Sequence, residues 1–148
     1  MTPLRSKPSE IEGAPRRAFP DFAVAAALAA LLASVIDLVV FWVARWLWDV
    51  PAGFSALNPL SIVIVATVGS VVAAVGLLVL VRVMRRARSV FLVLLTLVTL
   101  LSLVGPLQAL RGGIPNMPPA TVATGVTMMF MHFLTGGLIA AVLLVRTR

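Results

Sequence analysis

Four long apolar stretches constrain this chain more than any other feature of its sequence. They run over residues 22–48, 59–83, 90–110 and 118–145. Each reaches the roughly 20 apolar residues that carry a helix across a bilayer core about 30 Å thick. A membrane β-barrel would instead show segments of about 10 residues with alternating polarity, which the sequence lacks. We therefore predict an all-α integral membrane protein, built as a four-helix bundle.

The composition excludes a soluble domain. Hydrophobic residues make up 61% of the 148 residues and charged residues only 11%. A soluble domain has about half apolar and a quarter charged residues, so this chain lacks the polar side chains to cover a water-exposed surface. We expect the lipid bilayer to be its main partner.

The N-terminal segment differs from the rest of the chain. Residues 1–21 contain four prolines and seven charged residues, a composition that buries too little apolar area to offset the entropy lost on ordering. We predict a flexible basic tail over 1–21 and one membrane domain over 22–148. The apolar run that follows the tail is longer than the roughly 7–15 residues of a cleavable signal peptide, so we interpret the first helix as a retained anchor.

The positive charges predict the orientation. Ten of the 12 Lys and Arg residues lie in the N-terminal tail, where the second stretch passes into the third (Arg82 to Arg88) or at the C-terminus, which fall on one side of a four-helix protein. Only Arg45 and Arg111 remain for the other side. The positive-inside rule then places both termini in the cytoplasm of a bacterial inner membrane. The net charge of +7 thus describes orientation and headgroup contact, and we expect no nucleic-acid partner.

Two local signals mark helix boundaries. Asn58 before Pro59 is typical of a helix N-cap followed by proline in the first turn. Gly105 and Pro106 interrupt the third stretch, and Pro106 leaves the carbonyl of Ser102 without its helical hydrogen bond. We interpret Ser102, Gly105 and Pro106 as a kink with a polar face that shapes the bundle; a hydroxyl, a water or a ligand at the freed carbonyl is the alternative.

Small and polar residues recur at alternating spacings of three and four on three of the predicted helices. Such faces let helix backbones approach closely in lipid. We predict that these faces are buried against one another. They comprise Ala23, Ala27, Ala30, Ser34, Asp37, Phe41 and Ala44; Ile62, Ala66, Gly69, Ala73, Gly76 and Leu80; and Thr121, Gly125, Met128, His132, Thr135 and Ile139.

Asp37 and His132 are the ionisable residues deep within the apolar stretches. An acidic side chain near the bilayer centre costs about 2.5 to 3.5 kcal/mol on insertion scales, so it should face the protein interior and have a partner. Both residues belong to the predicted buried faces, and their depths permit a contact. One hypothesis is that they form an intramembrane pair. The alternative is that each finds a separate hydroxyl or backbone partner and serves packing.

The sequence offers few candidate residues for cofactor binding, metal binding or catalysis. His132 is the one histidine, so a haem or chlorophyll-type pigment at this side chain would need a second ligand from elsewhere. We predict no metal site. The absence of cysteine excludes thiol–disulfide chemistry, and the sequence has neither the ligand spacings of metalloenzymes nor a phosphate-binding loop. We therefore predict no catalytic residues.

The third and fourth stretches resemble a known family. The segment Leu101-Ser102-Leu103-Val104-Gly105-Pro106 and the pair Met131-His132 are similar to an uncharacterised family of four-helix bacterial membrane proteins, classified as a domain of unknown function. The resemblance implies four helices and a recurring set of Ser102, Gly105, Pro106 and His132. It brings no established activity.

Three hypotheses for function follow. The first is a non-catalytic accessory or interaction subunit of a membrane assembly or homo-oligomer, because the chain has small-residue faces and little mass outside the membrane. The second is a small proton- or solute-coupled transporter that uses Asp37 and His132. The third is a subunit that binds a haem or pigment at His132.

Overall fold

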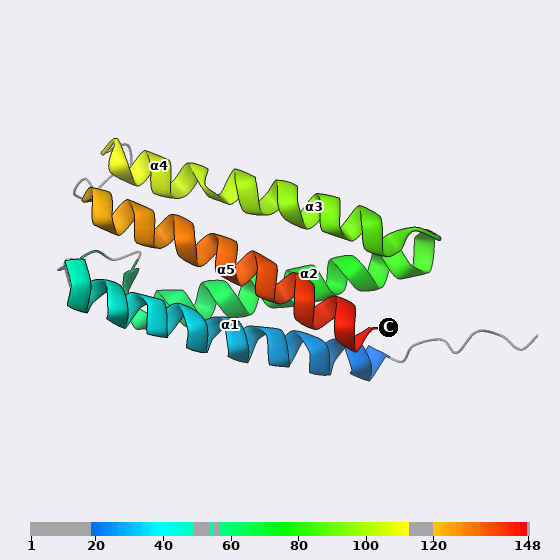
Figure 1. The fold of residues 1–148 in the computed structure, drawn as a ribbon. Helices are drawn as coiled ribbons and strands as arrows, with labels where there is room; N and C mark the ends of the chain where they lie inside the picture. Colours follow the sequence, from blue (N-terminus) through cyan, green and yellow to red (C-terminus); the bar gives the residue numbers. More distant parts are fainter. Residues whose placement is uncertain (1–18, 49–53, 55–56, 113–119, 148) are drawn as a thin grey trace, which may run out of the picture.

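A computed structural model describes residues 19–48, 54, 57–112 and 120–147. These residues form five α-helices: α1 (Phe19–Trp48), α2 (Pro59–Val83), α3 (Ala87–Ser102), α4 (Val104–Leu110) and α5 (Val122–Arg146). α4 continues the line of α3, so the chain has four helical stretches long and apolar enough to cross a membrane (Figure 1). The predicted all-α fold with four membrane helices is confirmed.

The helix starts differ from the predictions at three of the four stretches. α1 begins at Phe19, three residues before the predicted start. Proline is tolerated in a first helical turn and an acidic side chain favours it, and Pro20 and Asp21 supply both. α3 likewise begins at Ala87 instead of residue 90. Residues 1–18 of the predicted tail lie outside the described residues.

Side-chain caps set the starts of α2 and α5. Asn58 caps α2 as predicted, because its Oδ1 accepts from the backbone N–H of Ser61 at 2.8 Å. α5 begins at Val122, so the predicted start at Pro118 is wrong. The cause is Thr121, whose hydroxyl oxygen accepts from the backbone N–H of Thr124 at 3.1 Å.

The third stretch divides where its proline requires. α3 ends at Ser102 and α4 begins at Val104, with Leu103 between them. Pro106 is thus the third residue of α4, a position in the first turn where its missing N–H leaves no helical bond unmade. The single helix predicted over 90–110 thus becomes two, which follow one line.

The helices pack around two apolar clusters. α1 lies along both α2 and α5, α3 lies against α2 and α5, and α4 lies against α5 (Figure 1). We name the first cluster the arginine-end cluster: Phe22, Ala25, Ala26, Ala29, Ala74, Leu77, Leu78, Phe91, Ile139 and Leu143. We name the second the tryptophan-end cluster: Phe41, Ala44, Phe54, Leu57, Ile62, Ala109, Ala120 and Met131.

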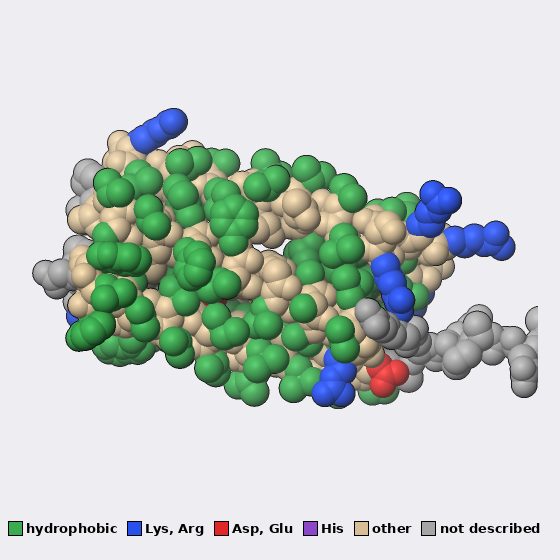
Figure 2. Space-filling model, viewed as in Figure 1, with side chains coloured by type: hydrophobic (Ala, Val, Ile, Leu, Met, Phe, Trp, Pro, Cys, Tyr) green, Lys and Arg blue, Asp and Glu red, His purple; other side chains and the backbone are tan. Residues whose placement is uncertain are grey.

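Charged side chains lie toward the ends of the bundle. Exposed apolar side chains cover the flank between these ends (Figure 2). Arg82 lies in the last turn of α2 and Arg146 in the last turn of α5, at the arginine end. Arg45 lies in the last turn of α1, at the opposite end, where its guanidinium stands 5.4 Å from the ring centre of Trp42.

The buried faces rotate away from the predicted ones. On α2, Ile62 and Ala66 are buried as predicted, but the face then continues through Ser70, Ala74 and Leu77. On α1, the predicted Ala23 and Ala27 are exposed, although the face is correct from Ala30 onward. The alternating spacing of four and three residues misses the face of α2 because the buried residues there follow one another at spacings of four, from Ile62 through Ala66 and Ser70 to Ala74.

Candidate functional site

Asp37 forms the centre of the candidate site. Its side chain is 6% exposed and lies on the face of α1 that packs against α2 and α5. The hydroxyl of Thr135 on α5 donates to Asp37 Oδ2 at 2.5 Å. Asp37 Oδ1 has no hydrogen-bond partner within the described part of the chain. One oxygen of the carboxyl group is therefore hydrogen-bonded, and the other is buried without a hydrogen-bond partner among the described residues.

His132 uses a different partner. Its Nδ1 lies 2.7 Å from the carbonyl oxygen of Met128, one turn earlier on α5, and the side chain is half-buried. The imidazole is close enough to interact electrostatically with Asp37, but no hydrogen bond joins them among the described residues. In this structure Asp37 thus bonds to a hydroxyl and His132 to a backbone carbonyl, which is the arrangement of the alternative hypothesis.

Ser70 is a residue that sequence reasoning missed. It lies on the buried face of α2 with 0% exposure, and its hydroxyl has no hydrogen-bond partner within the described residues. Buried polar groups are normally paired, so the Ser70 hydroxyl, like Asp37 Oδ1, is an exception among the described residues. The available signal was a serine near the middle of a mostly apolar stretch, but the heptad spacing selected Gly69 instead.

The predicted set Ser102, Gly105 and Pro106 serves the helix break. The Ser102 hydroxyl donates to the carbonyl of Thr99 at 2.6 Å, within its own helix. Pro106 is fully buried, whereas a side chain added at Gly105 would meet open space. The three residues lie on α3 and α4, and no hydrogen bond links them to Asp37 or His132 among the described residues.

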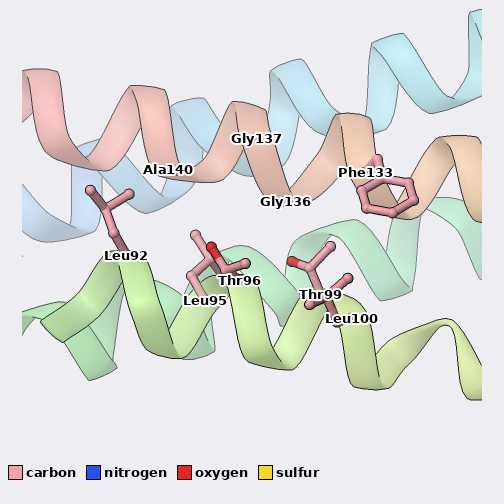
Figure 3. Close-up of a pocket in the computed structure, with 9 residues that line it drawn as sticks. All are labelled: Leu92, Leu95, Thr96, Thr99, Leu100, Phe133, Gly136, Gly137 and Ala140. Carbon is pink, nitrogen blue, oxygen red and sulfur yellow. The ribbon is translucent and has the colours of Figure 1, made fainter. Parts of the chain in front are cut away.

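A cleft of about 220 Å³ lies between α3 and α5 (Figure 3). Small residues of α5 line one wall, and the hydroxyls of Thr96 and Thr99 point toward them from α3. Neither hydroxyl has a hydrogen-bond partner in the described ranges. The helices approach closely at one point, because a Cβ added at Gly136 would lie 2.5 Å from Thr99 Oγ1. The lining residues are Leu92, Leu95, Thr96, Thr99, Leu100, Phe133, Gly136, Gly137 and Ala140.

A second hollow, of about 360 Å³, lies between α1 and α2 near the arginine end. The exposed Ala23 and Ala27 line it together with Val71 and Val75. Apart from Thr67 its lining side chains are apolar, so it resembles the lipid-facing surface around it.

A cofactor would have few ligands here. The bond of His132 Nδ1 to a backbone carbonyl leaves Nε2 as the ring nitrogen able to bind a metal. His132 lines neither of the two hollows. The described residues also contain no group of three or more His, Cys, Asp or Glu side chains that could hold a metal ion.

Comparison with known families gives a broader match than the sequence resemblance did. A family model described as "Family of unknown function (DUF6069)" matches residues 17–148. The chain belongs to this family. The match includes all four membrane stretches of this DUF6069 protein, where the resemblance rested mainly on the last two. No curated protein and no solved structure matches the chain.

Proposed function

We propose that this DUF6069 protein is a non-catalytic assembly subunit, which binds a transmembrane helix of a partner subunit or of a second copy in the cleft between α3 and α5. The main support for this proposal is the set of residues that line the cleft. Gly136 already meets Thr99 of α3, but Gly137 has nothing within 4 Å, so the small residues of this wall let a second helix approach closely at Gly137 and Ala140. Thr96 and Thr99 add two hydroxyls that are unpaired among the described residues. A helix can hydrogen-bond to them, whereas a lipid acyl chain cannot.

The weak packing of α3 supports this role. Only Ala87 and Phe91 are buried on α3, and both lie near its arginine end. The rest of the helix exposes apolar side chains together with the threonines of the cleft. A partner helix would bury this surface and complete the packing that α3 lacks.

The test compares two glycines. A Cβ added at Gly137 or at Gly76 meets nothing within 4 Å, so both positions have space for the start of a side chain. Gly137→Leu fills the cleft, whereas Gly76→Leu on α2 does not touch it. We expect crosslinking and native mass spectrometry of the full chain in bilayer discs to show a complex for the wild type and Gly76→Leu, and monomer for Gly137→Leu. Complexes that survive Gly137→Leu, or a monomeric wild type without partners, would refute the proposal.

The arginines support an orientation with the arginine end in the cytoplasm of a bacterial inner membrane. Because the chain has no cysteine, single-cysteine variants report sidedness without background. We expect a membrane-impermeant maleimide added outside cells to label Thr121→Cys and to spare Ser89→Cys. The reverse labelling would contradict this orientation.

Coupled transport is the second candidate function, and the Oδ1 of Asp37, unpaired within the described residues, favours it. Ionisable residues buried at mid-membrane depth commonly belong to ion or proton pathways. Proton or solute flux into liposomes should fall to the empty-liposome rate in Asp37→Asn. Unchanged flux in this variant would eliminate transport through Asp37.

A further inference from the structure

The hollow between α1 and α2 is a groove about as long as one leaflet of a bilayer. Its lining residues run from Phe19 to Ala30 on α1 and from Thr67 to Leu78 on α2. At a rise of about 1.5 Å per residue, each run spans about 16 Å along the bundle. One leaflet contributes half of a hydrocarbon core about 30 Å thick, or about 15 Å. The groove thus extends from near the arginine end to about the middle of the membrane.

Small side chains on one wall create the space in this groove. α2 contributes mainly larger side chains, and α1 contributes four alanines: Ala23, Ala26, Ala27 and Ala30. Several lining residues, among them Ala27 and Val75, are exposed, so the groove is open to the surrounding lipid. An apolar cavity of about 150 Å³ admits benzene, so a hollow of about 360 Å³ has room for roughly a dozen carbon atoms. A single acyl chain fits these dimensions.

Arginines lie beyond the arginine-end opening of the groove. Arg82 is four residues beyond Leu78, so it lies on the same face of α2, one turn nearer the end of the bundle. Arg85 and Arg86 follow in the turn before α3. All three are exposed, and none has a hydrogen bond or an ion pair within the described residues. Arginine side chains project from this end of the molecule in Figure 2.

The acidic residue at this end, Asp21, lies away from the groove. It belongs to the first turn of α1. Successive residues of an α-helix are about 100° apart, so Asp21 lies about 200° from both Phe19 and Ala23, which line the groove. Asp21 is therefore on the opposite side of α1. In the described part of the chain, no acidic side chain of α1 or α2 shares the groove face with Arg82.

The cleft between α3 and α5 differs at the corresponding position. Arg88 precedes Leu92, a lining residue of that cleft, by four positions and lies on the same face of α3. Its guanidinium donates to the carbonyl oxygen of Thr147, just beyond the end of α5, at 2.9 Å. The arginine beside the cleft thus has a protein partner, whereas Arg82 beside the groove has none among the described residues.

We propose that the groove binds one acyl chain of an anionic phospholipid, whose phosphate contacts Arg82. The apolar lining suits the chain, and the planar guanidinium can donate two parallel hydrogen bonds to a phosphate. Arg85 and Arg86 add positive charge that favours an anionic headgroup over a zwitterionic one. A second copy of the protein is a poor occupant, because copies in one membrane share one orientation and would bring their arginines together. The site is separate from the cleft and does not depend on the proposed function.

The experiment measures which lipid the full chain retains. The protein is purified from bilayer discs that hold equal amounts of phosphatidylglycerol and phosphatidylcholine with identical acyl chains, and native mass spectrometry counts the bound lipids. We expect the wild type to retain phosphatidylglycerol at least threefold more often than phosphatidylcholine. Arg82→Gln should lower that ratio at least threefold. Ala27→Leu narrows the groove without changing the charge, and it should reduce the retained lipid at least threefold.

Two matched controls lie on α5, which does not line the groove. Arg146→Gln removes one charge from the same end of the bundle, and Ala141→Leu adds the same bulk at an exposed alanine. Both should retain phosphatidylglycerol like the wild type. Thermal unfolding in detergent checks each fold, because a lipid that binds only the folded state raises the unfolding temperature. Added phosphatidylglycerol should raise it in the wild type and both controls, but not in Ala27→Leu or Arg82→Gln.

Several results would overturn the proposal. Equal retention of the two lipids by the wild type would show that the arginines select no headgroup. An equal loss of preference in Arg82→Gln and Arg146→Gln would show a diffuse attraction to the whole arginine end. Undiminished lipid retention in Ala27→Leu, or a second copy that binds the wild type and is lost in this variant, would show that no acyl chain occupies the groove.

Discussion

The hydrogen bond between Thr135 and Asp37 joins α5 to α1, and its energy can be predicted. Thr135→Val keeps the shape of the side chain but removes the donor. It leaves Asp37 without any hydrogen bond among the described residues, since Oδ1 already has none. Hydrogen bonds to charged groups contribute about 1.5–3 kcal/mol in soluble proteins, and side-chain bonds within membranes reach about 1.7 kcal/mol. We therefore expect Thr135→Val to destabilise the fold by about 1.5 kcal/mol, where the two ranges overlap.

A double-mutant cycle isolates this bond. Asp37→Leu removes the carboxylate, and in its presence Thr135→Val should cost less than about 0.3 kcal/mol, the usual error of additivity for unconnected sites. Thr135→Ser retains the donor and is the control, with a loss below about 0.8 kcal/mol, the value of one buried methyl group. Reversible unfolding in mixed detergent micelles measures all four corners of the cycle. A coupling energy no larger than that additivity error would show that the bond holds no stabilising energy and would refute this description of the site.

Two further predictions concern the fold. Gly125→Ala should destabilise the chain by about 1 kcal/mol, because the added Cβ would lie 2.5 Å from Leu110 Cγ and overpacking outweighs the gain in helix propensity. Gly76→Ala meets open space and should stabilise it by up to about 1 kcal/mol; equal effects of the two variants in detergent unfolding would contradict the packing of α4 on α5. Asn58→Ala should cost about 1 kcal/mol and Asn58→Ser much less, and similar losses for both would show that the cap on Ser61 is unimportant.

Much of the architecture could be predicted from the sequence because lipid imposes simple rules. A spanning helix needs a long apolar stretch, and the stretches predicted all four membrane segments. Proline in a helix interior forces a break, and the break before Pro106 is where its geometry requires. The start of α5 was missed because the prolines before it were given more weight than the cap formed by Thr121.

The candidate site was less predictable because side-chain contacts depend on helix rotation. Asp37 was identifiable as a lone acid in an apolar stretch, and Thr135 lay on a predicted buried face. The partner of Asp37 was not identifiable, because neighbouring turns of α5 offer both His132 and Thr135, and the charge was given more weight than the hydroxyl. Ser70 was not predicted for a related reason. An error of one residue in the position of the buried face of α2 places Gly69 on that face instead of Ser70.

The cleft and the candidate site at Asp37 meet at consecutive residues of α5. Thr135 bonds to Asp37 on one side of the helix, and Gly136 approaches Thr99 of α3 on the other. A helix bound in the cleft would press on the same turn of α5 that fixes the carboxylate. If it shifts that turn, helix binding and the Thr135–Asp37 hydrogen bond must strengthen or weaken each other by the same free energy, because coupling between two sites is reciprocal. The affinity of assembly would then change in Thr135→Val, which retains the cleft but removes this hydrogen bond, and unchanged assembly would show that the two sites are independent.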